Sequence, residues 1–163
     1  MRTWIVSIAV VCLLTPVRAE AWSFEVHKFI LAKAIPLLPI EIRPFFQKFQ
    51  VTIVEHAIDP DLWRTAGWEQ EPPRHFLNVD AYGPYPFIAM PRDHGEAVRR
   101  YGNDFVDKNG TLPWRAEEIH RKLTEAFAQT TPYARDNIKF FASVLGHYVG
   151  DAHVPFHAAL NYD

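Results

Sequence analysis

The sequence has little of three things that would each restrict its function: cysteine, positive charge and long apolar runs. Its 163 residues include one cysteine, Cys12. Because Cys12 falls in a segment predicted below to be removed, the mature chain would have neither a thiol nor a disulfide bond. The formal net charge is −2, and no cluster of basic residues indicates a nucleic-acid surface. Any stabilisation beyond side-chain packing would therefore have to come from a bound metal ion.

The N-terminal apolar run is too short to cross a membrane, which takes about 20 residues. It covers residues 4–14, follows Arg2 and precedes a small-x-small cleavage site at residues 19–21. This order predicts a secretory signal peptide over residues 1–21. We therefore expect a secreted or periplasmic protein that starts at Trp22 and has no integral membrane segment after signal cleavage.

Residues 22–163 contain no internal repeat and no low-complexity segment, which indicates a single domain. Apolar residues recur with helical spacing in five stretches, namely residues 24–35, 41–57, 92–106, 113–129 and a last helix that starts with Thr131 as N-cap and Pro132. Prolines and a glycine predict a loop over residues 58–74, followed by a short extended piece at residues 75–80. The sequence therefore predicts an all-α fold.

The densest group of metal-binding side chains lies near the C-terminus, in the segment HYVGDAHVPFH. His147 and Asp151 are four residues apart and therefore share one face of a helix. Pro155 is expected to end or kink that helix, which lets His157 approach the same cavity from another direction. Zinc prefers nitrogen and oxygen ligands at about 2.0–2.2 Å. The motif predicts a zinc site, although the same pair is also typical of a surface salt bridge.

The expected start at Trp22 would add a second set of ligands. A free α-amine has a pKa of about 7.7–8.0 and is partly neutral at neutral pH, so it can bind zinc. The adjacent carbonyl oxygen of Trp22 can close a five-membered chelate ring. His27 follows five residues later and can complete the set.

Two further candidates lie between these ends. Asp61 stands in the segment Asp-Pro-Asp-Leu-Trp-Arg, and His75 stands in Arg-His-Phe. Both are in or beside the expected loop, where functional groups are commonly presented. A helix-cap role for Asp61 and a buried structural role for His75 remain alternatives. Asp59, in the same segment, is the alternative to Asp61 as a ligand.

Taken together, these residues resemble the family of zinc-dependent phospholipase C and S1/P1-type nucleases, over nearly all of residues 22–163. The resemblance is carried by the order and spacing of Trp22, His27, Asp61, His75 and the motif His147-x3-Asp151-x3-Pro155-x-His157. It implies an all-α, phospholipase C/P1 nuclease-like helical domain that holds a cluster of three zinc ions in a cleft.

The resemblance also implies how the ligands are divided among the zinc ions. One ion would be bound by Asp61, His75, His147 and Asp151. A second ion would be bound by the amine and carbonyl of Trp22, by His27 and by Asp151. Asp151 would therefore bridge the pair.

His157 would belong to the third zinc ion, which the family completes with a later histidine and an acidic residue four positions on. This chain ends at Asp163 and has neither. We therefore expect the closing C-terminal part of the family fold to be missing and the chain to support two zinc ions. Asp61 is preferred to Asp59 because Asp-Leu-Trp-Arg is similar to the family's Asp-x-aromatic-Arg stretch.

The implied activity is that of a secreted zinc-dependent phosphodiesterase, a phosphoric ester hydrolase in which a zinc-bound hydroxide attacks phosphorus. Zinc lowers the pKa of bound water to about 7, and paired ions stabilise the negative oxygens of the transition state. Asp61 and Asp151 are the catalytic candidates, because either carboxylate could orient the hydroxide.

Two substrates remain open, with a slight preference for a phospholipid head group. A phospholipase C-like enzyme is favoured by Glu25, which stands where an acidic residue of bacterial phospholipase C helps to bind a quaternary ammonium group. An S1/P1-type single-strand nuclease is favoured by the five-residue gap from Trp22 to His27 and by aromatic residues on which bases can stack. A third alternative is a truncated homologue that binds zinc without catalysis.

Overall fold

The computed structural model describes residues 23–160, and every regular element in that range is helical. The all-α expectation is therefore confirmed for these residues, whereas the expected signal peptide and Trp22 lie outside them. The elements, with η for 3-10 helices, are α2 (Phe24–Ala34), η1 (Ile35–Leu37), α3 (Arg43–Lys48), α4 (Gln50–Glu55), η2 (His56–Ile58), α5 (Asp59–Thr65), η3 (Pro72–His75), η4 (Val79–Tyr82), α6 (His94–Tyr101), α7 (Asn103–Asn109), α8 (Leu112–Phe127), α9 (Ala134–Asp151) and η5 (Pro155–His157).

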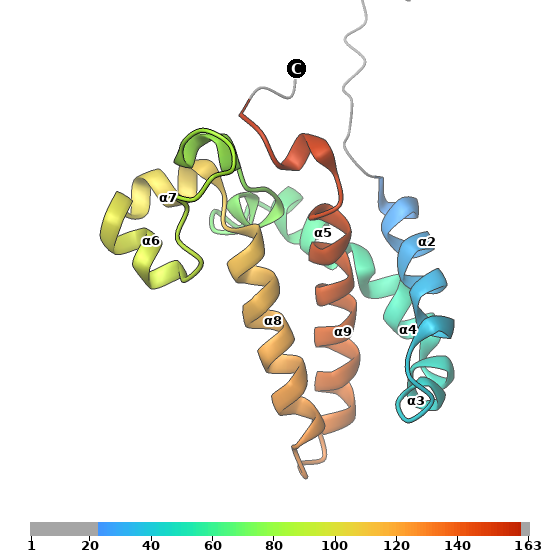
Figure 1. Cartoon of the computed structure of the whole chain (residues 1–163). Helices are drawn as coiled ribbons and strands as arrows, with labels where there is room; N and C mark the ends of the chain where they lie inside the picture. Colours follow the sequence, from blue (N-terminus) through green and yellow to red (C-terminus); the bar gives the residue numbers. More distant parts are fainter. Residues whose placement is uncertain (1–22, 161–163) are drawn as a thin grey trace, which may run out of the picture.

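The helices are arranged around α9. It runs antiparallel to α8, α2 and α4 pack along its other side, and α6 and α7 lie beyond α8 (Figure 1). Because α9 has neighbours on both sides, its buried residues are spread around the helix and include Ile138, Val144, His147 and Tyr148. The helix that carries the C-terminal motif is thus the central element of the fold.

Three apolar clusters hold this arrangement together. The first joins α2, α3 and α4 to the adjoining ends of α8 and α9 and includes Ile35 and Ile53. The second lies beneath η4, α6 and α7 around Trp114 of α8. The third lies between α8 and α9 around Tyr148. Full burial of Ile35 and Ile53 stabilises the fold by roughly 1.5–3 kcal/mol for each side chain.

Two glycines of α9 allow α2 to approach closely. A Cβ atom added to Gly146 would lie 2.6 Å from Cδ1 of Leu31, and one added to Gly150 would lie 3.1 Å from Nδ1 of His27. The two glycines are four residues apart, so they lie on the same face of the helix. Their missing side chains bring His27 of α2 against the end of α9.

Two expectations from the sequence are wrong because of a proline and a glycine. The loop expected over residues 58–74 contains α5, since Pro60 falls in the first turn, where a helix does not need its N–H group. The helix expected over residues 92–106 is divided at Gly102, whose φ of +84° ends α6.

Other boundaries differ by smaller amounts. The helix expected over residues 41–57 is interrupted at Phe49, which separates α3 from α4. Of the extended piece expected at residues 75–80, Phe76 has extended backbone, whereas His75 ends η3 and Val79 starts η4. The last helix starts at Ala134, after a turn that contains Thr131 and Pro132. Within residues 23–160, none of the helices has both the length and the apolar character of a membrane span.

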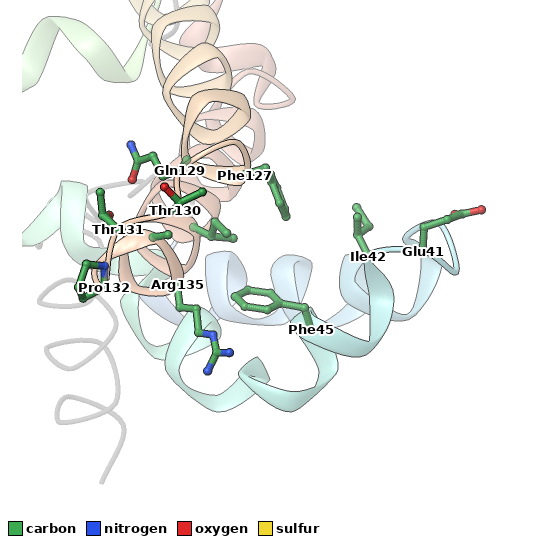
Figure 2. Close-up of a pocket in the computed structure, with 12 residues that line it drawn as sticks. Glu41, Ile42, Phe45, Phe127, Gln129, Thr130, Thr131, Pro132 and Arg135 are labelled. Carbon is green, nitrogen blue, oxygen red and sulfur yellow. The ribbon is translucent and has the colours of Figure 1, made fainter.

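A groove of about 650 Å³ lies where α3 meets the turn between α8 and α9. Ile42, Phe45 and Phe127 line it, and Arg135 lies beside it on α9 (Figure 2). The groove involves the start of α9, and Ile138, its lining residue furthest along that helix, precedes His147 by nine residues, or roughly 14 Å at 1.5 Å per residue. The groove is therefore separate from the site described below.

Replacing Gly146 by alanine should lower the free energy of unfolding by about 0–2 kcal/mol, since overpacking costs about 1–3 kcal/mol and a helical alanine returns about 1 kcal/mol. Leu31→Ala should cost about 2–5 kcal/mol, because it leaves a cavity. In the double variant the new methyl group fills part of that cavity, so the combined loss should be smaller than the sum. Urea denaturation of the four proteins measures this coupling, and strictly additive losses would contradict the close approach.

Candidate metal centre

Asp151, in the last turn of α9, lies at the centre of the site and is almost completely buried. Its Oδ2 atom is 3.2 Å from Nε2 of His147, the contact that the four-residue spacing predicts. The same oxygen is 2.9 Å from Nδ1 of His75, at the end of η3. The other carboxylate oxygen, Oδ1, is 3.3 Å from Nε2 of His27 on α2. Histidines from three elements therefore surround one carboxylate.

Asp61 adds a second buried carboxylate from the first turn of α5. Its Oδ1 atom lies 3.9 Å from Nδ1 of His75 and 3.0 Å from Nη2 of Arg64. Asp59, the alternative ligand, lies closer to the surface, and its Oδ2 atom is 2.9 Å from Nδ1 of His56. The structure thus brings Asp61 to the histidines and leaves Asp59 apart from them.

Two groups of buried ligand atoms are compact enough to hold a metal ion. One group comprises His27, His147 and Asp151, the other comprises Asp61, His75 and His147, and in each the ligand atoms lie within 4.8 Å of one another. Bonds of about 2.0–2.2 Å to a tetrahedral zinc ion would place neighbouring ligand atoms roughly 3.3–3.6 Å apart. In the second group, Nδ1 of His75 lies 3.1 Å from Nε2 of His147 and 3.9 Å from Oδ1 of Asp61, and these separations bracket that value. These His/Asp groups can therefore hold a metal ion, and His147 is common to both.

The orientation of His147 suits a ligand. Its Nδ1 atom lies 2.8 Å from the carbonyl oxygen of Ala57, which can only accept a hydrogen bond. In the neutral ring Nδ1 therefore carries the proton, and the lone pair of Nε2 faces Asp151 and Nδ1 of His75, the latter at 3.1 Å. The ring of His27 stacks on that of His147 with centroids 4.0 Å apart, which keeps both rings in place.

Burial and hydrogen bonding act in opposite directions on the ionisable groups of the site. Burial favours the neutral acid of Asp151, but its contacts with His147, His27 and His75 outweigh burial and hold the pKa of the carboxyl well below its ordinary value. Burial likewise favours the neutral ring of His75, but its contacts with the carboxylates of Asp151 and Glu71 raise the pKa of His75 to about 9. Without a metal ion, Asp151 is therefore ionised and His75 protonated at neutral pH.

Two other residues predicted for the site, His157 and Glu25, lie outside the two ligand groups. His157, in η5, is half-buried; burial lowers its pKa, whereas the charge of Asp151 raises it. The segment is fixed by the amide of Leu77, which donates to the carbonyl oxygen of His157 at 2.8 Å. Glu25 is exposed in the first turn of α2. The expected N-terminal ligand, Trp22, falls outside the described residues.

Reasoning from the sequence missed two residues beside the ligands, Glu71 and Tyr148. Glu71 is fully buried, and its carboxylate accepts hydrogen bonds from the Tyr148 hydroxyl and, at 2.8 Å, from Nη1 of Arg74. Its four-residue spacing from His75 was the available signal, but that spacing has no structural meaning in a segment expected to be a loop. Tyr148 falls in the apolar repeat of the last helix, so its position in the sequence does not distinguish it from an ordinary core residue.

Comparison of the chain with protein-family models, with curated proteins and with solved structures finds no match. The function is therefore inferred from the geometry of the site. That geometry consists of buried imidazole and carboxylate groups, which α2, α5, η3 and α9 bring into contact.

Zinc affinity should rise as the pH increases from about 6 to 9, because His75 must lose a proton before Nδ1 can bind a metal. The metal-free fold should respond in the opposite direction. Protonated His75 contributes stability that is complete below the unfolded pKa of about 6.5 and is lost as the pH rises towards the folded pKa of about 9. Calorimetric zinc titrations in buffers of different protonation enthalpy would measure both the affinity and the protons released.

A matched pair of substitutions tests whether this pH dependence belongs to His75. His75→Asn should weaken the dependence of zinc affinity on pH. His120→Asn, at an exposed position of α8, should leave it unchanged. An affinity that does not vary with pH in the unsubstituted chain would contradict the assignment of Nδ1 as a metal ligand.

Proposed function

We propose that this chain is a zinc-dependent phosphoric ester hydrolase, a secreted phospholipase C-like phosphodiesterase with the phospholipase C/P1 nuclease-like fold. The observation that carries the proposal is that two buried ligand groups share His147, while Asp151 contacts histidines of both. Two ligand groups in direct contact would place two metal positions side by side, as in two-metal phosphoesterases. When bound, a zinc pair would supply an activated water and positive charge that stabilises the phosphoryl oxygens.

The residues of the chain would bind and orient these ions and the substrate. Asp61, His75 and His147 form one ligand group, and His27 and Asp151, which the amine of Trp22 would join, form the other. Arg64 contacts Asp61 and is half-exposed. Its guanidinium group would therefore be available beside the site for a phosphate oxygen, a contact that arginine makes well.

A phospholipid head group is the substrate that we favour. Glu25 is exposed in the first turn of α2, on the helix that carries His27. The two residues are two positions apart, so their side chains leave the helix in different directions. Glu25 would thus bind the cationic end of a head group at the rim of the site, apart from the ligands that face the phosphate.

A single-strand nuclease is the second candidate, and Trp68 is the observation that favours it. Its side chain is 56% exposed and its ring stacks on that of Trp63, with centroids 5.5 Å apart and an angle of 11°. Trp63 lies in α5 two residues after Asp61. An exposed indole supported by a second one suits the stacking of unpaired bases. Zinc binding without either activity would favour the third alternative, a non-catalytic homologue.

Asp61→Asn should lower the bound zinc by about one ion and reduce phosphodiester hydrolysis by at least about 100-fold, since even groups that only support a metal ligand alter affinity or activity about 10–100-fold. Asp59→Asn is the matched control, because Asp59 is two residues away on α5 but outside both ligand groups. Zinc content and hydrolysis of a chromogenic phosphodiester, phosphatidylcholine and single-stranded DNA are the measurements. Equal effects of the two substitutions would contradict the assignment of Asp61.

A Met-Ala extension in front of Trp22 tests the proposed N-terminal ligand. The extension converts the amine of Trp22 into an amide, which cannot bind zinc in the same way, so the chain should lose one zinc ion and its activity. A removable extension, cleaved to regenerate Trp22, should restore both. Unchanged zinc content in the extended chain would contradict the N-terminal ligand.

A further inference from the structure

Glu71 is a buried carboxylate that belongs to neither ligand group, with an exposed fraction of 0%. A buried charge is costly unless it is paired and hydrogen-bonded. Nη1 of Arg74 donates to Oε2 at 2.8 Å, and the hydroxyl of Tyr148 donates to Oε1. Glu71 is thus held in a fixed position immediately behind the cluster.

The group that Glu71 faces is Nε2 of His75. This nitrogen is buried and has no hydrogen-bond partner within residues 23–160, and Oε1 of Glu71 lies 3.6 Å from it. The other nitrogen, Nδ1, points into the cluster, at 2.9 Å from Asp151 and 3.1 Å from His147. A neutral imidazole has one N–H group and one lone pair. If Nδ1 binds a metal ion, Nε2 must carry the proton and needs an acceptor.

His147 shows the same division of roles with a different acceptor. Its Nδ1 atom faces the carbonyl oxygen of Ala57 at 2.8 Å, and its Nε2 atom faces the cluster. A carboxylate in this position also raises the basicity of the ring, which strengthens the bond to a metal. Glu71 would therefore accept a hydrogen bond from His75, as the carbonyl oxygen of Ala57 does from His147, but Glu71 also carries a negative charge.

We propose that Glu71 is a positioning residue, which accepts a hydrogen bond from the Nε2–H group of His75 and so directs Nδ1 to the metal, while Tyr148 holds Glu71 in place. The inference rests on the proposed metal centre and adds a residue that the sequence resemblance does not include. Tyr148 directly follows His147 on α9, and Nε of Arg115 on α8 lies 3.5 Å from its hydroxyl. The carboxylate is thus fixed from the same helix that carries two ligands.

Zinc affinity, measured by competition with a chromogenic chelator, is the test. Glu71→Gln should weaken zinc binding by about 10–100-fold, because the amide is a weaker acceptor and no longer suits Arg74. Glu55→Gln is the matched control and should leave zinc affinity unchanged; Glu55 forms an ion pair with Lys28 at 2.6 Å, outside both ligand groups. Tyr148→Phe removes one hydroxyl and should cause a smaller loss than Glu71→Gln. It also provides a second variant if Glu71→Gln does not fold.

A double-mutant cycle separates positioning from a merely structural role. In a His75→Ala chain, Glu71→Gln should cause no further loss of the zinc binding that remains at the His27 group, because its effect passes through His75. An equal loss in both backgrounds, or no loss when the unsubstituted chain binds zinc, would overturn this inference alone. Failure of the unsubstituted chain to bind zinc would overturn the proposed function, and the inference with it.

Discussion

The fold depends on keeping one ionised carboxylate, that of Asp151, inside the molecule. Burying an unpaired charge costs several kcal/mol. The other buried carboxylates have arginine partners, since Asp61 pairs with Arg64 and Glu71 with Arg74. Within residues 23–160 no arginine or lysine forms an ion pair with Asp151, whose contacts there are with histidines of α2, η3 and α9. These three elements must stay together, because each supplies a histidine that contacts the buried carboxylate.

The backbone of α9 makes this convergence possible. Gly146 and Gly150 each cost about 1 kcal/mol of helix stability relative to alanine, but they form a face without side chains against which Leu31 and His27 pack. On its other side α9 packs against α8, and this contact buries Tyr148 beside Glu71. The helix α9 therefore carries two candidate ligands, His147 and Asp151, and its glycines let a third, His27, approach. It also carries Tyr148, whose hydroxyl binds the carboxylate of Glu71.

Helical periodicity in the sequence was enough to predict the all-α fold and the contact between His147 and Asp151, because both depend on the repeat of a single helix. It failed at Pro60, because the sequence does not distinguish a proline in the first turn of a helix from a proline in a loop. Contacts between elements were beyond reach without a known structure. The approach of His27 depends on glycines in another helix, and the role suggested for Glu71 depends on a tyrosine 77 positions away. The meeting of His75 and Asp61 with α9 was expected from the family resemblance, and nothing in their local sequence predicts it.

A metal ion would satisfy the lone pairs of this cluster better than a proton does. Without a metal, the proton on Nδ1 of His75 faces two acceptors, Oδ2 of Asp151 at 2.9 Å and Nε2 of His147 at 3.1 Å, which are themselves 3.2 Å apart. A proton forms one strong hydrogen bond at a time, so one lone pair stays poorly satisfied beside a carboxylate oxygen in a buried site. A cation at the centre would bind all three atoms at once and leave His75 neutral, with its remaining proton directed at Glu71. It would also replace a single positive charge by two, and this surplus of positive charge is what would attract a phosphate group to an otherwise acidic protein.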